Sequence, residues 1–153
     1  MFESVIKLKT CADTLNFGIK VGSMAFPGDV ICLDGELGAG KTTLTQGIAK
    51  GLGVPPSWYV TSPSFSILHE YPGRIPLYHM DFYRLNSSAE VEELGLEEYF
   101  YMSGLTVIEW SERAEGILPA DRLTVNIRIE AGNERVASFP YVSEKWRIRQ
   151  IAE

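Results

Sequence analysis

The chain has 153 residues, of which 45% are hydrophobic and 22% are charged. This length is typical of one domain with one core, and the composition is that of a globular protein rather than a disordered one. The 14 Lys and Arg residues against 20 Asp and Glu residues give a net charge of −6, which argues against direct binding of bare nucleic acid or of an anionic membrane. We therefore expect a single domain over residues 1–153 that does not bind a membrane.

The sequence predicts neither export nor a membrane span. Residues 1–7 lack the basic stretch and apolar run of a leader peptide, and the longest uncharged run, residues 51–69, contains three prolines. The two cysteines, Cys11 and Cys32, form no Cys-x-x-Cys pair, so we expect unpaired thiols in a cytoplasmic protein. The basic residues within 145–149 are expected to form a solvated helix face.

Hydrophobic periodicity predicts two strand–helix pairs in the first half of the chain. They are a strand at 5–8, a helix from Thr10 to about residue 25, a strand at 30–33 and, after a glycine-rich loop, a helix that ends at Gly53. Thr10 and Asp13 have the spacing of a capping box, in which the Thr hydroxyl accepts a bond from a free backbone amide. The expected order is therefore strand, helix, strand, loop, helix.

The second half predicts two hairpins with helices and a strand between them. The first hairpin pairs 66–71 with 75–82, and the second pairs 122–129 with 135–139 around Gly132-Asn133. Between them we expect a helical stretch from Ser87 to Phe100 that is interrupted near Gly95, a buried strand at 105–108 and a short helix from Ser111; a last helix from Ser143 would bury Trp146. Because tight hairpins join antiparallel neighbours only, this pattern predicts an α/β fold with a mixed sheet and helices on both faces.

A complete phosphate-binding motif of the Walker A type follows the second predicted strand. The run Gly35-Glu-Leu-Gly38-Ala-Gly40-Lys41-Thr42 matches G-x-x-x-x-G-K-[ST] in full and leads directly into a helix. Glycines allow consecutive backbone N–H groups to point into one concavity, and the helix N-terminus favours anions there. Lys41 brings a charge to the terminal phosphates, and the Thr42 hydroxyl is a suitable ligand for Mg²⁺. The motif predicts a nucleotide site.

Two acids follow apolar strands at places where a phosphate loop needs a carboxylate. Asp81 ends the strand 77–81, and Glu109 ends the strand 105–109. Such carboxylates hold Mg²⁺ or orient the attacking water, and we favour Glu109 for the metal shell while leaving the division of roles open. His79 lies two residues before Asp81 and therefore shares its face of the strand.

The choice of nucleotide rests on motifs that the sequence lacks. There is no Asn-Lys-x-Asp motif for guanine and no Asp-x-x-Gly after Asp81, which favours ATP over GTP. Ser62 and Ser64 lie in a loop where nucleotide switches place a hydroxyl that senses the terminal phosphate and its Mg²⁺. For Trp110 we favour core packing over a surface role near the nucleotide.

Four runs in the chain resemble the TsaE family, also called YjeE. They are Gly-Glu-Leu-Gly-Ala-Gly-Lys-Thr-Thr at 35–43, Thr-Ser-Pro-Ser-Phe at 61–65, Tyr-His-Met-Asp-Phe-Tyr-Arg-Leu at 78–85 and Ile-Glu-Trp at 108–110. The resemblance extends over nearly the whole chain and implies a P-loop NTPase-like fold. It departs from the family pattern at Ser64, where Thr is usual, and at Ser111, where Pro is frequent.

The resemblance also implies an activity and partners. TsaE-like proteins are small cytoplasmic bacterial ATPases, weakly active alone, that work with TsaB, TsaD and TsaC in making threonylcarbamoyladenosine in tRNA. They bind the TsaB–TsaD pair, and their ATP hydrolysis is thought to reset that complex, so tRNA is contacted only indirectly. The implied cofactors are ATP and Mg²⁺.

Carried over by position, the resemblance completes the expected site. The catalytic residues would be Lys41, Asp81 and Glu109, and the metal ligands would be Thr42 and Glu109. The nucleotide-binding residues would be Thr10, Cys11, Gly38, Ala39, Gly40, Lys41, Thr42, Thr43, Ser62, Ser64 and Arg135, with Thr10, Cys11 and Arg135 near the base.

Two other functions use the same phosphate loop. A small-molecule kinase would transfer the phosphate to a metabolite, with Asp81 as base. A non-catalytic nucleotide-binding module would need Lys41 but not the carboxylate of Glu109. Loss of all function in a Glu109→Ala variant that still binds nucleotide would separate this module from an ATPase.

Overall fold

The computed structural model describes residues 4–152, whose strands form one mixed seven-stranded sheet in the order β1-β7-β6-β2-β5-β4-β3. The strands are β1 (Val5–Leu8), β2 (Val30–Asp34), β3 (Leu68–Tyr71), β4 (Leu77–Asp81), β5 (Leu105–Glu109), β6 (Leu123–Ile129) and β7 (Arg135–Val142). The four central strands are parallel, and β1, β7 and β3 pair antiparallel at the two sides. The predicted mixed sheet is confirmed.

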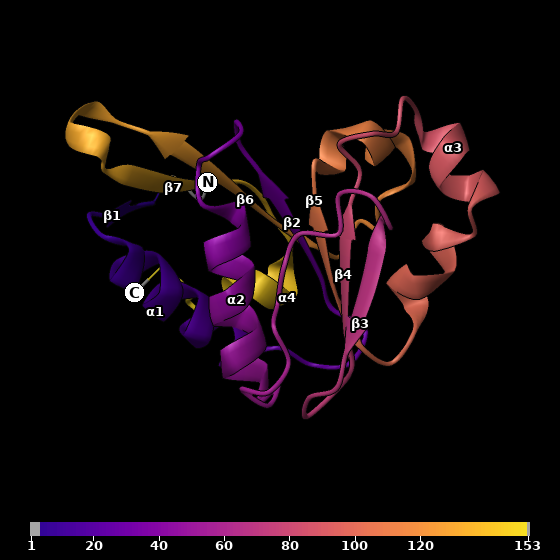
Figure 1. Cartoon of the computed structure of the whole chain (residues 1–153), viewed down its shortest axis with the longest axis horizontal. Helices are drawn as coiled ribbons and strands as arrows, with labels where there is room; N and C mark the ends of the chain where they lie inside the picture. The colour runs from indigo at the N-terminus through magenta and orange to yellow at the C-terminus, as the bar shows by residue number, and fades with distance from the viewer. Residues whose placement is uncertain (1–3, 153) are drawn as a thin grey trace.

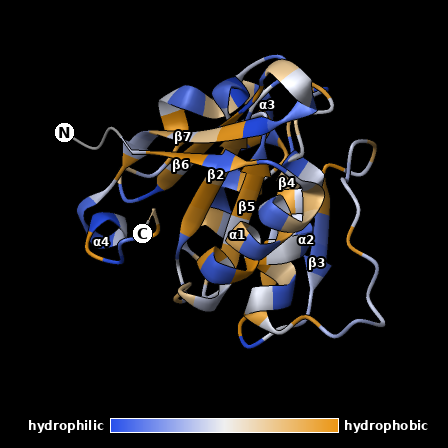
Figure 2. Cartoon of the chain, turned by 90° about the vertical axis from the view of Figure 1, so that its left-hand side faces the viewer, coloured by the Kyte–Doolittle hydropathy of each residue, from blue (hydrophilic) through white to orange (hydrophobic). Residues whose placement is uncertain are grey.

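Helices cover both faces of this sheet (Figure 1). The helices α1 (Cys11–Ser23) and α2 (Lys41–Leu52) pack on one face, together with the short α4 (Glu144–Arg147). The other face packs against α3 (Ser88–Glu93) and the 3₁₀ helices η1 (Leu96–Tyr101) and η2 (Ser111–Ile117). Figure 2 shows apolar central strands between these layers. Two apolar cores therefore hold the sheet in place, as runs of buried parallel strands require.

The helices α1 and α2 pack through glycines at four-residue spacing. Gly18 and Gly22 of α1 face Gly47 and Gly51 of α2, and a Cβ atom at any of the four would overlap the backbone of the other helix. Small residues at this spacing let two helix backbones approach closely, and α2 begins at the phosphate loop. The contact therefore fixes the helix that carries Lys41 and Thr42.

Several predicted boundaries differ from the observed ones. The strand expected at 66–71 begins only at Leu68, because Ile67 has a φ of 71° and breaks the extended backbone. Gly95 interrupts the stretch between α3 and η1 as predicted, with a φ of 72°. At the start of α3, Ser87 and Glu90 have the spacing of a second capping box, but only half of it forms: Ser87 accepts a bond from the Glu90 amide, while the Glu90 carboxylate accepts from Asn86. The first box, at Thr10 and Asp13, forms in full.

The prediction of a solvated basic face near the C-terminus is wrong. Lys145 and Arg149 both pair with Asp29, which is fully buried, at 2.9 and 2.6 Å. Two cations compensate the buried carboxylate, which would otherwise be costly without a partner. These pairs dock α4 onto the domain, and Trp146 is buried, as predicted.

The hairpin of β6 and β7 turns at the predicted place. The 3₁₀ turn η3 (Ala131–Asn133) joins the two strands, and Gly132 and Asn133 have positive φ. None of the helices in the described residues is long and apolar enough to cross a membrane. Residues 1–3, part of the stretch expected to lack a leader, lie outside the described chain.

Candidate nucleotide site

The loop between β2 and α2 has the backbone that its glycines allow. Gly38 and Gly40 have φ values of 80° and 109°, in the region that favours glycine. A Cβ atom at Gly38 would meet nothing within 4 Å, so the loop leaves open space where a phosphate would lie. Gly40 caps α2 without a side-chain hydrogen bond, which leaves the amides of the first turn for a ligand.

Lys41 is held against this loop and against an aromatic ring. Its Nζ donates to the carbonyl oxygens of Gly35 and Glu36, the second at 3.2 Å, and lies 4.1 Å from the centre of the Trp110 ring. Burial lowers the pKa of Lys41, while the nearby carboxylates of Glu109 and other acids act in the opposite direction. Trp110 packs against the apolar core on the η2 side of the sheet, as we favoured, and it also forms part of the wall of the site.

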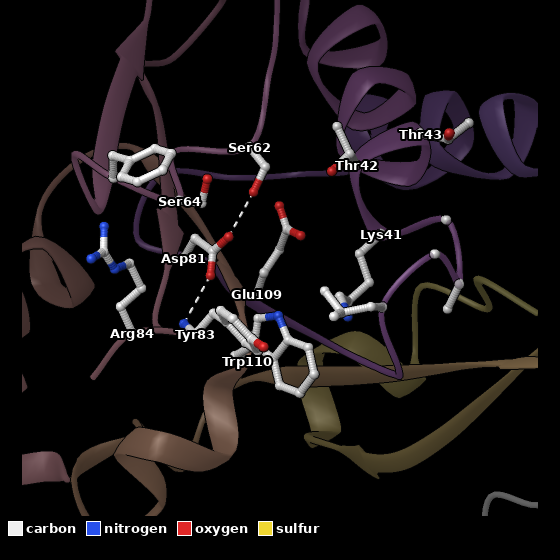
Figure 3. Close-up of a pocket in the computed structure, with 15 residues that line it drawn as sticks. Lys41, Thr42, Thr43, Ser62, Ser64, Asp81, Tyr83, Arg84, Glu109 and Trp110 are labelled. Atoms are coloured by element: carbon white, nitrogen blue, oxygen red, sulfur yellow. Dashed lines mark hydrogen bonds between the residues drawn. The ribbon is translucent and has the colours of Figure 1, made fainter. Parts of the chain in front are cut away.

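The two predicted acids lie beside each other at the carboxyl edge of the sheet. Asp81 and Glu109 are direct partners in the register of β4 and β5, and both line a cavity of about 690 Å³ with the phosphate loop. Both carboxylates point into the space faced by Lys41 and Thr42 (Figure 3). Strand topology thus brings together acids that are 28 positions apart in the sequence.

The loop with the two serines reaches the same cavity. Ser62 Oγ donates to Asp81 Oδ2 at 2.6 Å, and the Tyr83 amide donates to Asp81 Oδ1 at 2.9 Å (Figure 3). Ser64 lines the cavity as well. Asp81 is therefore fixed on both oxygens, and one of these bonds comes from the predicted switch-like loop.

Glu109 has a buried partner that the sequence did not identify. His79 Nε2 and Glu109 Oε2 are 2.6 Å apart, and the two residues are 0% and 3% exposed. The sequence places His79 on the face of Asp81, but the bond to Glu109 depends on the register of two strands. No local pattern could have predicted it.

The donor set in the cavity suits Mg²⁺. Thr42, Asp81 and Glu109 offer hard oxygen atoms, and Mg²⁺ is usually held by one or two carboxylates together with substrate phosphates and water. Among residues 4–152, no group of three or more His, Cys, Asp or Glu side chains could hold a metal by itself. The residues thus fit a metal that arrives with a nucleotide.

A second hollow lies on the other side of the phosphate loop. It has a volume of about 330 Å³, shares Gly38, Ala39, Gly40 and Thr43 with the first cavity, and is lined by the predicted base-side residues Thr10, Cys11 and Arg135. The Arg135 side chain donates to Ala39 O at 3.0 Å and to Gly38 O at 3.1 Å. The structure therefore brings all predicted site residues to the two sides of one loop.

The sequence did not predict the hydrogen bonds between Ser111 and Asp34, the residue directly before the phosphate loop. Trp110 has a φ of 59°, and the next residue, Ser111, donates from both its amide and its hydroxyl to Asp34 at 2.9 Å. Burial and the neighbouring Glu112 together raise the pKa of Asp34 to about 6, while the hydrogen bonds from Ser111 oppose the shift. Ser111 stands where the resembled family often has Pro, which has no amide hydrogen to donate.

The mouth of the cavity is formed by exposed side chains from several loops. Leu37 and Phe65 are 66% and 85% exposed, and the Arg84 guanidinium lies 4.9 Å from the Phe65 ring. Arg84 lines the cavity, whereas Arg113 lies outside it, 5.8 Å from the Trp110 ring. Of these two arginines, Arg84 is therefore the one at the cavity.

Comparisons with known proteins identify the family to which the chain is related. A model of the family described as "Threonylcarbamoyl adenosine biosynthesis protein TsaE" matches residues 8–137. The chain is similar to the tRNA threonylcarbamoyladenosine biosynthesis protein TsaE of Bacillus subtilis, with 45% identity over 82% of this chain and 78% of the relative. It is also similar to the TsaE protein of Treponema pallidum, with 41% identity over 83% of this chain and 93% of the relative.

A solved structure supports the same conclusion about the fold. The crystal structure of YdiB from Bacillus subtilis matches with a TM-score of 0.81 and 37% identity, over 97% of this chain and 93% of that one. This match confirms the predicted P-loop NTPase-like fold. Fold, phosphate loop and sequence agree, and the chain belongs to the TsaE family of threonylcarbamoyl adenosine biosynthesis proteins.

Proposed function

We propose that this chain, acting as a single domain, binds ATP and hydrolyses it with Mg²⁺ as a component of the machinery that makes threonylcarbamoyladenosine in tRNA. One observation carries the proposal: a complete phosphate loop and two strand-end carboxylates, Asp81 and Glu109, line the same cavity. Family membership supports the pathway, because the relatives from Bacillus subtilis and Treponema pallidum are named for it.

The side chains have distinct roles in this proposal. The amides of residues 38–42 and Lys41 bind the phosphates, and Thr42 and Glu109 hold the metal. Bound Mg²⁺ would neutralise charge on the phosphate oxygens. Asp81 orients the attacking water, and its bond from Ser62 ties that acid to the loop that senses the terminal phosphate. Thr10, Cys11 and Arg135, on the far side of the loop, would lie near the base.

Lys41 must change partners when ATP binds. Its Nζ is bound to two carbonyl oxygens of the loop, and it is shielded by Trp110. A phosphate oxygen is a stronger acceptor than a neutral carbonyl because it is charged. Exchange of these bonds for phosphate is the step by which nucleotide binding would reorder the loop and the Trp110 wall.

The proposed partners follow from the family and from charge. The net charge of −6 leaves little attraction for tRNA, so other proteins must hold it. We propose that the chain acts in the cytoplasm on a complex of TsaB and TsaD, which transfers the threonylcarbamoyl group supplied by TsaC. ATP turnover would then be slow in the chain alone and faster with the pair.

The test is phosphate release from Mg-ATP by the purified chain, alone and with TsaB and TsaD. Slow release alone, a clear rise with the pair and no release by Lys41→Ala would support the proposal. Normal release by Lys41→Ala would contradict the site. ATP consumption that yields a phosphorylated metabolite, without free phosphate, would replace the ATPase by a small-molecule kinase.

A further inference from the structure

We propose that His79 is a positioning residue for Glu109: it holds the carboxylate in the orientation that faces Thr42 and the metal. This inference rests on the proposed function of Glu109 in hydrolysis. The observation that carries it is the 2.6 Å contact between His79 Nε2 and Glu109 Oε2, which is closed to solvent.

His79 lies on β4 two residues before Asp81, behind the wall of the cavity. Residues Leu77, His79 and Asp81 alternate onto the face of β4 that packs toward α2, since Leu77 belongs to the core under that helix. In the register, Asp81 faces Glu109 and His79 faces Val107. His79 is 0% exposed and does not line the cavity. Any effect of His79 on a bound nucleotide must therefore pass through another side chain.

The direction of the bond follows from the chemistry of its two partners. An ionised carboxylate only accepts hydrogen bonds, so the ring hydrogen must be on Nε2. Among the described residues, His79 Nδ1 is buried and has no hydrogen-bond partner. Leaving a polar atom unpaired in a core costs free energy, and an apolar side chain would fill the space without that cost. The bond to Glu109 is therefore the feature that distinguishes His79 from a core residue that only packs.

Glu109 depends on this bond for its orientation. Its carboxylate has no other hydrogen bond among residues 4–152, and the nearby Lys41 donates to Gly35 and Glu36 instead. Asp81, in contrast, is bound on both oxygens. Side chains that hydrogen-bond metal-binding carboxylates orient them, and their loss typically lowers metal affinity or activity by 10–100-fold.

The test compares two substitutions at His79 with a matched control. His79→Leu removes the donor and keeps an apolar core, while His79→Gln keeps an amide donor near the Nε2 position. His69→Leu is the control. His69 lies opposite His79 in the register of β3 and β4, and it does not line the cavity. The readouts are kcat, the Mg²⁺ concentration for half-maximal rate, and the ATP dissociation constant with EDTA and with Mg²⁺.

We expect His79→Leu to lower kcat by about 10–100-fold and to raise the Mg²⁺ requirement. Its ATP dissociation constant in EDTA should stay within about twofold of the parent, because the phosphate loop is unchanged, and Mg²⁺ should no longer tighten binding. His79→Gln should recover most of the loss, and His69→Leu should behave as the parent. Equal losses of ATP binding with and without Mg²⁺ would overturn the inference.

A double substitution separates this inference from the proposed function. Glu109→Gln should abolish the tightening by Mg²⁺, and adding His79→Leu should then cause no further change, because the two residues act through one bond. Normal hydrolysis by Glu109→Gln would overturn the function of Glu109 itself. A defective Glu109→Gln beside a normal His79→Leu would overturn the role of His79 alone.

The parent protein offers a direct check that does not depend on folding of a variant. The chain has only two histidines, so the ring nitrogens of both can be assigned by long-range ¹H–¹⁵N correlation. We expect His79 to carry a hydrogen on Nε2. A ring with the hydrogen on Nδ1 alone could not donate to Glu109 and would overturn the proposal.

Discussion

Asp34 shows how a single residue couples charge to the architecture of the site. It is the last residue of β2, directly before the phosphate loop, and it accepts two bonds from Ser111, which follows the Glu109-Trp110 turn. Burial and the neighbouring Glu112 raise its pKa from 3.8 to about 6. The ionised form is therefore tolerated at neutral pH but costs stability.

The free energy of unfolding should depend on pH through the carboxyl group of Asp34. Because the folded state binds the proton more tightly than the unfolded state, the contribution of Asp34 is present below about pH 4 and is lost as the pH rises through about 6. Asp34→Asn should thus raise the free energy of unfolding at pH 7.5 by on the order of 1–2 kcal/mol and give no gain at pH 4. Urea denaturation at both pH values measures this. An equal effect at the two pH values would contradict the assignment.

At the scale of elements, the α1–α2 contact controls where the phosphate loop helix lies. The four glycines at its centre place backbone against backbone, so any side chain added there would force the two helices apart. Tightly packed interiors absorb extra atoms poorly. Strain at this contact would move α2 and with it the residues of the first turn.

A methyl group at this contact should therefore destabilise the domain. We expect Gly22→Ala to lower the free energy of unfolding by about 3 kcal/mol, because the new Cβ atom would overlap the backbone of Ile48. Gly116→Ala is the control, since nothing lies within 4 Å of a Cβ atom there. Chemical denaturation of both variants measures this difference. Similar denaturation midpoints for Gly22→Ala and Gly116→Ala would show that the helices do not pack this closely.

The tip of the β6–β7 hairpin is the second element that holds the phosphate loop. Arg135 at the start of β7 donates to the carbonyl oxygens of Gly38 and Ala39 and is positioned by the Asn133 carbonyl. In a trans peptide the carbonyl oxygen and the amide hydrogen point in opposite directions, so the bond to Ala39 O turns the Gly40 amide away from the arginine. The Ala39 amide donates to Glu36 O at 3.1 Å, so Arg135 and this bond together fix the conformation of the loop.

Removal of Arg135 should weaken nucleotide binding more than stability. We expect Arg135→Ala to raise the dissociation constant of ADP by about tenfold, or ~1.4 kcal/mol, through loss of these hydrogen bonds. Arg128→Ala is a control on the same hairpin, because Arg128 is exposed, pairs with the exposed Glu130 and does not contact the phosphate loop among the described residues. Calorimetric titration of both variants gives the comparison, and equal affinities would show that the arginine does not order the loop.

For the molecule as a whole, the features that could be predicted from the sequence are those that depend on neighbouring residues in the chain. Periodicity, capping residues and glycines placed nearly every helix and strand, and the phosphate loop and strand-end acids were found from spacing alone. The bonds His79–Glu109, Asp34–Ser111 and Arg135–Gly38 join residues 30, 77 and 97 positions apart. Such contacts depend on strand order and register, which local patterns do not encode.

The wrong expectation for residues 145–149 has the same origin. A basic cluster with one inward Trp146 has the pattern of an exposed helix face. Its partner, Asp29, lies 120 positions from Arg149 and is itself buried beneath α4. The pairing of Lys145 and Arg149 with Asp29 is therefore visible only in the three-dimensional structure.

The most direct test of the central claim is a comparison of ATP binding with ATP hydrolysis in Glu109→Ala. The phosphate loop and Lys41 are untouched in this variant, so it should bind ATP within a fewfold of the parent. Its phosphate release, measured with TsaB and TsaD present, should fall by at least ~100-fold, because the carboxylate that holds the metal is lost. Turnover at the parent rate would contradict the account of the site.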